Sequence, residues 1–239
     1  MILEICANSY QSAINAEKAG AHRIELCSEL AMGGITPSYG LLKKVMQDVS
    51  IPVHVLIRPR SGDFTYSDVE FEIMKENILL CKDLGCAGIV SGALNLNNTI
   101  DYYKTRLLVH YSKGMSFTFH RAFDWLKNPK DGLLKLSKMG VDRVLTSGQE
   151  LTAENGLSLL KEWKDHTDVK IMPGGGINLN NVQLFQEAGF EEIHLSATKR
   201  EQTIDVPKIS MNSLKHFEET QRSTSDIEMI RNISSKING

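Results

Sequence analysis

Segments with the hydrophobic pattern of β-strands alternate with helical patterns along most of this chain. Short, β-branched apolar runs are each followed by an amphipathic stretch, and several helical stretches end at a glycine, as at Gly20, Gly85, Gly140 and Gly189. Parallel strands need a helical crossover between them, so this alternation predicts an all-parallel sheet. We predict eight strands: Ile2–Cys6, His22–Cys27, Pro52–Arg58, Gly88–Ser91, Ser116–His120, Asp142–Thr146, Val169–Met172 and Glu192–Ser196.

Eight β/α units in 239 residues indicate an α/β protein with a single-domain (β/α)8 TIM barrel. A doubly wound open sheet is the competing architecture, and it is less favoured because no GxGxxG motif follows the first strand. We expect residues 1–200 to form the barrel. Residues 201–239 turn polar, and we expect them to add a C-terminal helix followed by a mobile polar tail within the same domain.

The first two strands both end in a Glu-x-Cys sequence, Glu4 to Cys6 and Glu25 to Cys27. Side chains alternate along a strand, so each glutamate shares a face with its cysteine. Extending the polar face to the other strands predicts a lumen of unusually polar composition: Glu4, Cys6, Arg23, Glu25, Cys27, His54, Arg58, Ser91, Thr118, His120, Thr146, His194 and Ser196. Such a lumen favours a reaction chamber or a metal site, although ion pairs of the glutamates with Arg23 and Arg58 would also explain it.

The two strand-end thiols, Cys6 and Cys27, are candidate ligands for a soft metal. Neighbouring strands lie about 5 Å apart, and two thiolates select Cu(I). Zinc would need two further ligands, which no CxxC or HxxxH spacing supplies. The alternative is that both cysteines pack as small hydrophobic residues. Cys81 and Cys86 lie in and after a predicted helix, and we interpret them as structural.

Arg58 and Arg60 follow the third strand in a loop that continues to Asp63. Two guanidinium groups at the carboxyl end of a barrel strand are suited to a carboxylate or phosphate. We therefore predict that both arginines bind an anion. Salt bridges to Glu25 or Asp63 are the structural alternative.

His120 ends the fifth strand and is followed closely by Asp124. A histidine there is a candidate general acid or base, Asp124 would orient either His120 or Arg121, and Glu25 would be a second catalytic carboxyl group. The alternative is a histidine that hydrogen bonds hold within a polar lumen.

Small polar and glycine residues follow the last three strands, at Ser147, in the turn Gly174–Gly176 and at Ser196. Glycine-rich turns after late barrel strands commonly bind phosphate through backbone N–H groups. The anion-binding set is therefore expected to include Ser147, Gly175, Gly176 and Ser196.

The charge balance excludes several classes of partner. Lys and Arg number 27 against 29 Asp and Glu, a net charge of −2, which does not indicate binding to nucleic acid or to a membrane surface. No apolar stretch is long enough to span a bilayer, and the N-terminus shows no signal-peptide pattern. We predict a cytoplasmic protein with reduced cysteines.

These segments together resemble the CutC family of copper homeostasis proteins. The similarity rests on Glu4–Asn8, Arg23–Ser28, Gly33–Ser38, Ile57–Arg60, Gly62–Phe64, His120–Asp124, Leu145–Gly148 and Gly174–Gly176, with loop variations at Ser61, Gln149 and Pro173. The resemblance implies a cytoplasmic TIM barrel that forms a homodimer or a higher homo-oligomer. It also implies a role in copper tolerance, with Cys6 and Cys27 as the Cu(I) ligands.

Two functional hypotheses follow. The leading one is a copper homeostasis protein that binds Cu(I) through Cys6 and Cys27. The alternative is a barrel enzyme, a lyase, isomerase or hydrolase, acting on a small anionic metabolite, phosphorylated or not. Neither hypothesis implies an organic cofactor.

Overall fold

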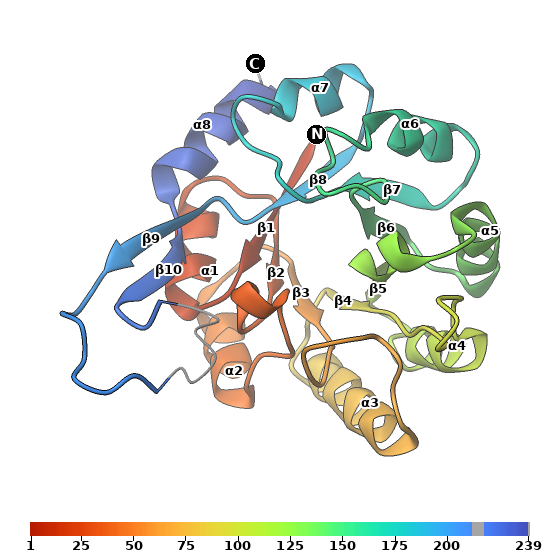
Figure 1. Ribbon diagram of the computed structural model, residues 1–239, viewed down its shortest axis with the longest axis horizontal. Helices are drawn as coiled ribbons and strands as arrows, with labels where there is room; N and C mark the ends of the chain where they lie inside the picture. Colours follow the sequence, from red (N-terminus) through yellow and green to blue (C-terminus); the bar gives the residue numbers. More distant parts are fainter. Residues whose placement is uncertain (212–217, 239) are drawn as a thin grey trace.

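Eight parallel strands form a nearly closed barrel in the computed structural model, which describes residues 1–211 and 218–238 (Figure 1). Neighbouring strands follow the chain order from β1 to β7, and β8 pairs with β1. A bridge between Gly174 and His194 joins β7 to β8. This is the predicted (β/α)8 TIM barrel. The strands are β1 Ile2–Ala7, β2 Arg23–Leu26, β3 Val53–Leu56, β4 Gly88–Ser91, β5 Ser116–Phe119, β6 Arg143–Thr146, β7 Lys170–Pro173 and β8 Glu192–Leu195.

Helices surround the barrel as an outer ring in Figure 1. Many begin at side-chain caps: the hydroxyl groups of Ser9, Ser38 and Ser67 each accept a hydrogen bond from a backbone N–H three residues later. The α-helices are α1 Tyr10–Lys18, α2 Tyr39–Asp48, α3 Asp68–Asp83, α4 Tyr102–Tyr111, α5 Pro129–Met139, α6 Leu157–Asp165, α7 Val182–Glu187 and α8 Ile227–Asn238. Two 3₁₀ turns, η1 Leu30–Met32 and η2 Arg121–Trp125, follow β2 and β5.

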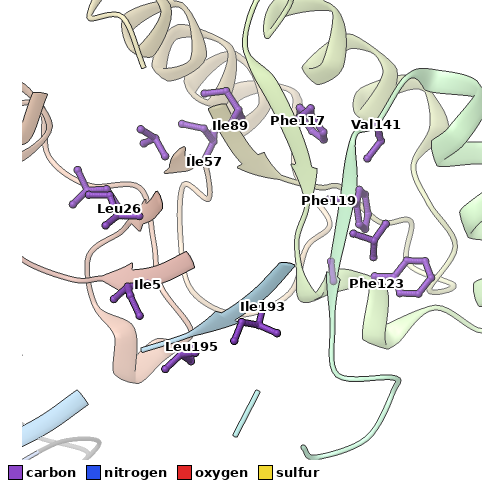
Figure 2. Packing of buried hydrophobic residues seen from close by; sticks show 14 of the residues in the cluster. Ile5, Leu26, Ile57, Ile89, Phe117, Phe119, Phe123, Val141, Ile193 and Leu195 are labelled. Atoms are coloured by element: carbon purple, nitrogen blue, oxygen red, sulfur yellow. The ribbon is translucent and has the colours of Figure 1, made fainter. Parts of the chain in front are cut away.

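The main hydrophobic core lies between the barrel strands and the helices. Outward-facing strand residues such as Ile5, Leu26, Ile89 and Phe117 are buried there, and Figure 2 shows several of them along the strands. A separate small cluster lies inside the lumen, where Cys6, Cys27, Leu56 and Val90 pack together. The alternation of apolar residues therefore directs the polar face of β1, β2 and β3 inward, as predicted.

The C-terminal region differs from the expected order of helix and tail. Strands β9 (Thr198–Gln202) and β10 (Gln221–Ser225) form an antiparallel pair, and α8 then ends the described chain. The expectation of a helix before a polar tail was wrong because this polar segment pairs through its main chain. The β10 end is fastened to α1, since Ser225 N donates to Ser12 Oγ at 3.0 Å.

Helix α8 buries Ile230, Ile233 and Ile237, which lie on one face of the helix. Figure 1 shows it beside α7 at the top of the ring. In the described part of the chain, no helix is both long and apolar enough to cross a bilayer.

Candidate functional site

A cavity of about 340 Å³ opens among the loops that follow the strands, at the carboxyl ends of the barrel. This is the end at which TIM-barrel proteins place their functional sites. Residues from at least six of the β/α units line it: Cys6, Glu25, Leu30, Gly33, Leu56, Arg58, Phe64, His120, Arg121, Leu145, Gly175, Gly176, Ile177, His194, Leu195 and Ser196.

The two predicted thiol ligands meet at this cavity. Cys6 Sγ lies 3.6 Å from Cys27 Sγ, and both residues are buried. Cys6 lines the cavity, whereas Cys27 lies behind it, against Leu56 and Val90. The pKa of Cys6 is raised well above its usual value. The causes are the hydrogen bond of Cys6 with Cys27, its burial and the nearby Glu25 carboxyl group. The Cys6 thiol is therefore protonated at neutral pH.

A histidine lies between two buried carboxyl groups beside Cys6. His194 Nδ1 is 2.7 Å from Glu4 Oε1, and its Nε2 is 3.4 Å from Glu25 Oε2. Burial by itself would lower the pKa of His194, but Glu25 and Glu4 outweigh burial and raise it. Burial raises the pKa of Glu25, although His194 opposes this effect. The sequence placed His194 in the lumen but did not identify it as a partner of both glutamates.

Glu4 itself is fully buried and held as an anion. Burial would raise its pKa, but the hydrogen bond from His194 and the charge of Arg23 lower it far below its usual range. Arg23 Nε donates to Glu4 Oε2 at 2.5 Å. A fixed anion on Nδ1 keeps a proton on that nitrogen, so Nε2 of His194 is directed at Glu25 and the cavity.

Three donor atoms near the thiols could also hold a metal ion. The ligating atoms of Cys6, Glu25 and His194 all lie within 4.8 Å of one another. Sulfur, oxygen and nitrogen in one set suit a borderline metal such as zinc better than the two thiols do. Cys6 therefore belongs to two overlapping ligand sets, of which the sequence predicted only the thiol pair.

Arg143 and Glu192 are lumen residues that the sequence analysis missed. Arg143 Nε lies 3.0 Å from Glu192 Oε2, and Arg23 Nη2 lies 2.5 Å from the same oxygen. Each missed residue is the first of its strand, where a charge looks like the end of a loop. The inward parity of β8, set by His194, would have identified Glu192, whereas Arg143 was missed because the inward parity of β6 was assigned to Thr146 instead of Leu145.

Thr146 and Ser91 were predicted to face the lumen, but both face away from it. Leu145 lines the cavity, so its neighbour Thr146 faces away, where its hydroxyl group binds Asp124. Ser91 likewise faces away from the lumen and donates to Ile57 O at 2.8 Å.

The structure separates the two arginines predicted to bind an anion. Arg58 lines the cavity, and its guanidinium group donates to Gly34 O at 2.9 Å and to Gly62 O at 2.7 Å. Arg60 instead forms ion pairs with Glu70 at 2.5 Å and Asp63 at 3.1 Å. The salt-bridge alternative therefore describes Arg60, and its assignment to the anion site was wrong.

His120 lines the cavity, but Asp124 does not orient it. Asp124 contacts Arg121 Nε at 2.8 Å and the backbone N–H groups of Ser147 and Gln149. It joins η2 to the loop after β6, so its predicted catalytic role is replaced by a structural one. Of the two alternatives, Asp124 orients Arg121.

The glycine turn and Ser196 line the cavity as predicted for an anion-binding wall. Ser147 lies behind this wall, where its hydroxyl group bonds with Arg121, Asp124 and the carbonyl of Glu150. Its contribution is therefore to position Arg121, which does line the cavity.

Comparison with known proteins assigns the chain to a family. The sequence model of the CutC family matches residues 1–199. A family protein CutC of Enterobacter sp. (strain 638) is 49% identical over 199 residues, covering 83% of this chain and 81% of that protein. One from Erwinia tasmaniensis is 43% identical and covers 95% and 92% of the two chains.

Solved structures agree with the fold. A candidate copper homeostasis protein CutC from Streptococcus agalactiae superposes with a TM-score of 0.76 at 34% identity, covering 81% of this chain and 97% of that one. Thiamine phosphate pyrophosphorylase from Pyrococcus furiosus has a TM-score of 0.61 at 12% identity over 99% of this chain and 95% of the other. At that identity the likeness concerns the fold alone.

Proposed function

This chain belongs to the CutC family of copper homeostasis proteins, and from that premise we propose that it binds Cu(I) between the thiols of Cys6 and Cys27. The observation that carries the proposal is the distance of 3.6 Å between the two Sγ atoms. Two sulfurs at that separation can both lie about 2.3 Å from one ion, the length of a zinc–thiolate bond.

The surroundings of the pair favour a soft ion. Leu56 and Val90 form one buried apolar cluster with the two cysteines, so the site is apolar on one side. Soft thiolates in such a site select Cu(I) over harder cations. The mixed set of Cys6, Glu25 and His194 is the competing site, and a borderline divalent ion would choose it.

Binding requires that the thiols lose their protons. Because Cys27, burial and Glu25 all raise the pKa of Cys6, the ion must displace a Cys6 proton that is held firmly at neutral pH. We therefore expect Cu(I) affinity to increase as the pH rises.

The test is a competition between the protein and a Cu(I) chelator under reducing conditions. We expect the wild type to bind one equivalent of Cu(I), and Cys6→Ser and Cys27→Ser each to lose this binding. The matched control is Cys81→Ser with Cys86→Ser, since those buried cysteines lie outside the cavity and their loss should leave binding intact. Unchanged affinity in the double variant Cys6→Ser, Cys27→Ser would refute the proposal.

Other parts of the functional hypothesis remain predictions. A cytoplasmic location and a homo-oligomeric state are expected from the sequence and from the family resemblance. The enzymatic alternative, with Glu25 and His120 as catalytic groups, requires that the cavity binds a small anion.

A further inference from the structure

We propose that the same cavity contains a second binding centre, formed by Arg58 and His120, that holds the acidic group of a small organic anion. This centre is separate from the proposed Cu(I) site and does not depend on it. It would also provide what the enzymatic alternative requires.

Arg58 is a buried cation without a carboxylate partner. It is 6% exposed, and among the described residues no Asp or Glu oxygen lies within 4.0 Å of its nitrogens. Its guanidinium group contacts three backbone carbonyls and the face of Phe64, whose ring centre is 4.9 Å away. Carbonyls orient the group but leave its charge uncompensated, which is costly in a buried site.

The other buried arginines of the barrel show the difference. Arg23 pairs with Glu4 and Glu192, and Arg143 pairs with Glu192. The protein therefore supplies counter-ions where the lumen is closed. At Arg58, where the lumen opens into the cavity, we infer that the ligand supplies the counter-ion.

His120 offers a hydrogen-bond donor that has no acceptor. Ala122 N donates to His120 Nδ1 at 3.3 Å, so in the neutral ring the proton lies on Nε2. The residue is 5% exposed and lines the cavity, and Nε2 has no hydrogen-bond partner within the part of the chain that the structure describes. Burial and the charge of Arg58 lower the pKa of His120 to about 3, so the ring is a neutral donor at physiological pH.

One aromatic side chain holds both donors in place. Phe64 packs against the His120 ring with a centroid distance of 4.8 Å and also lies under the Arg58 guanidinium group. Gly33 leaves space for Arg58, because a Cβ there would lie 3.2 Å from Nη1. Donors fixed in this way lose little entropy when a ligand binds.

The glycine turn extends the donor-rich surface. Gly175 and Gly176 line the cavity with positive φ angles of 106° and 74°, and a Cβ on Gly175 would lie 3.2 Å from Nη1 of Arg121. Only glycine allows the backbone to lie so close to this second cation. Arg121 and Ser196 add further donors on the same side.

The cavity volume and its remaining lining define the ligand class. A volume of about 340 Å³ is in the range of small-molecule sites and exceeds what a single metal ion requires. Glu25 and His194 line the cavity as well, so a ligand would present a neutral polar group to them and its acidic group to Arg58. We therefore expect a small carboxylate or phosphate monoester that also carries a hydroxyl or carbonyl group.

The test measures saturable binding by calorimetry and by thermal stability, using inorganic phosphate, glycerol 3-phosphate and succinate as probes. Sodium chloride at equal ionic strength controls for screening. We expect at least one probe to bind with one-to-one stoichiometry. Binding by the phosphates alone or by succinate alone would identify the acidic group.

Substitutions test whether Arg58 and His120 bind the anion. Arg58→Gln and His120→Phe should each weaken binding by about tenfold or more, since each removes a hydrogen bond to a charged group. Arg60→Gln is the matched control, because that arginine is paired with Glu70 and lies outside the cavity. If Arg58→Gln does not fold, His120→Phe decides, since it keeps a ring against Phe64.

Two results would overturn the proposal: no saturable binding of any probe to the wild type, or an equal loss in Arg60→Gln. The double variant Cys6→Ser, Cys27→Ser should retain anion binding. A failure of the Cu(I) proposal is therefore distinguishable from a failure of this one.

Discussion

The imidazole ring of His54 occupies space inside the barrel that exists only because residue 88 is a glycine. A Cβ on Gly88 would lie 2.5 Å from both Cδ2 and Nε2 of His54. The two residues are register partners on β3 and β4, so the contact is built into the sheet. A lumen that holds the His54 ring instead of an aliphatic side chain thus requires a small residue opposite it.

We predict that Gly88→Ala destabilises the protein by about 1–3 kcal/mol through overpacking against this ring. In a His54→Ala background the same substitution should cost much less, because the clashing atoms are gone. Urea unfolding of the four proteins gives the coupling. Gly40→Ala in α2 is the control, since no atom lies within 4 Å of its Cβ position and alanine favours helix. Additive effects of the two substitutions would contradict the prediction.

Neighbouring residues of one type can have different roles. Arg58 and Arg60 are two positions apart, so both point to the same side of an extended chain, yet one lines the cavity and the other pairs with Glu70. Their side chains separate because the loop from Ser61 folds back and its carbonyls and Asp63 surround Arg60. Which of the two arginines pairs with a carboxylate depends on the path of this loop, which residue type alone does not reveal.

Secondary-structure elements depend on local signals that the sequence displays. Helix α3 begins at a capping box, in which Ser67 Oγ accepts from Glu70 N at 3.2 Å and Glu70 Oε2 accepts from Ser67 N at 2.8 Å. The helix therefore begins at Asp68, directly after the cap. Helix α7 begins only at Val182, because the backbone N–H of Asn178 donates to Asn181 Oδ1 and closes a turn ahead of it.

We predict that Ser67→Ala costs about 1 kcal/mol of stability, because the backbone N–H of Glu70 in the first turn of α3 loses its side-chain acceptor. Ser67→Asp should retain most of the stability, since its carboxylate also accepts from the helix N-terminus. Thermal unfolding of the two variants provides the measurement. Unchanged stability in Ser67→Ala would contradict the prediction and show that the cap contributes little.

The barrel buries titratable groups, and burial makes their pKa values differ between the folded and the unfolded chain. His120 has a pKa of about 3 in the folded protein against an ordinary value of 6.5, since burial and then Arg58 disfavour its charged form. Below pH 6.5 the unfolded chain takes up a proton that the folded chain does not. The free energy of unfolding is therefore at its full value with respect to His120 above pH 6.5. It decreases as the pH falls from 6.5 towards 3.

We predict that the wild type loses about 1–2 kcal/mol more stability than His120→Gln when the pH falls from 7.5 to 5. The glutamine does not titrate, whereas the other buried carboxyl groups contribute equally to both proteins. Urea unfolding at the two pH values measures the difference in slope. Parallel losses would mean that His120 is protonated in the folded state.

The amino-acid pattern was sufficient to predict the barrel, the polar lumen and the place of the cavity. Strand and helix periodicity is a local property, and parallel strands linked by helices have few ways to close. Cys6, Cys27, Arg58 and His120 could therefore be placed at one end of one barrel. The main failure in the chain's organisation was the C-terminal region, where β9 and β10 pair through the backbone of polar residues.

Which side chains meet at that end depended on three-dimensional packing. The 3.6 Å between the two thiols, the position of His194 between Glu4 and Glu25, and the unpaired state of Arg58 result from strand stagger and loop paths. Those features are set by contacts between residues that are distant in the chain, and no periodicity encodes them. Residue pattern thus specifies the architecture and its polar interior, whereas tertiary contacts specify which polar groups are satisfied and which remain available to a ligand.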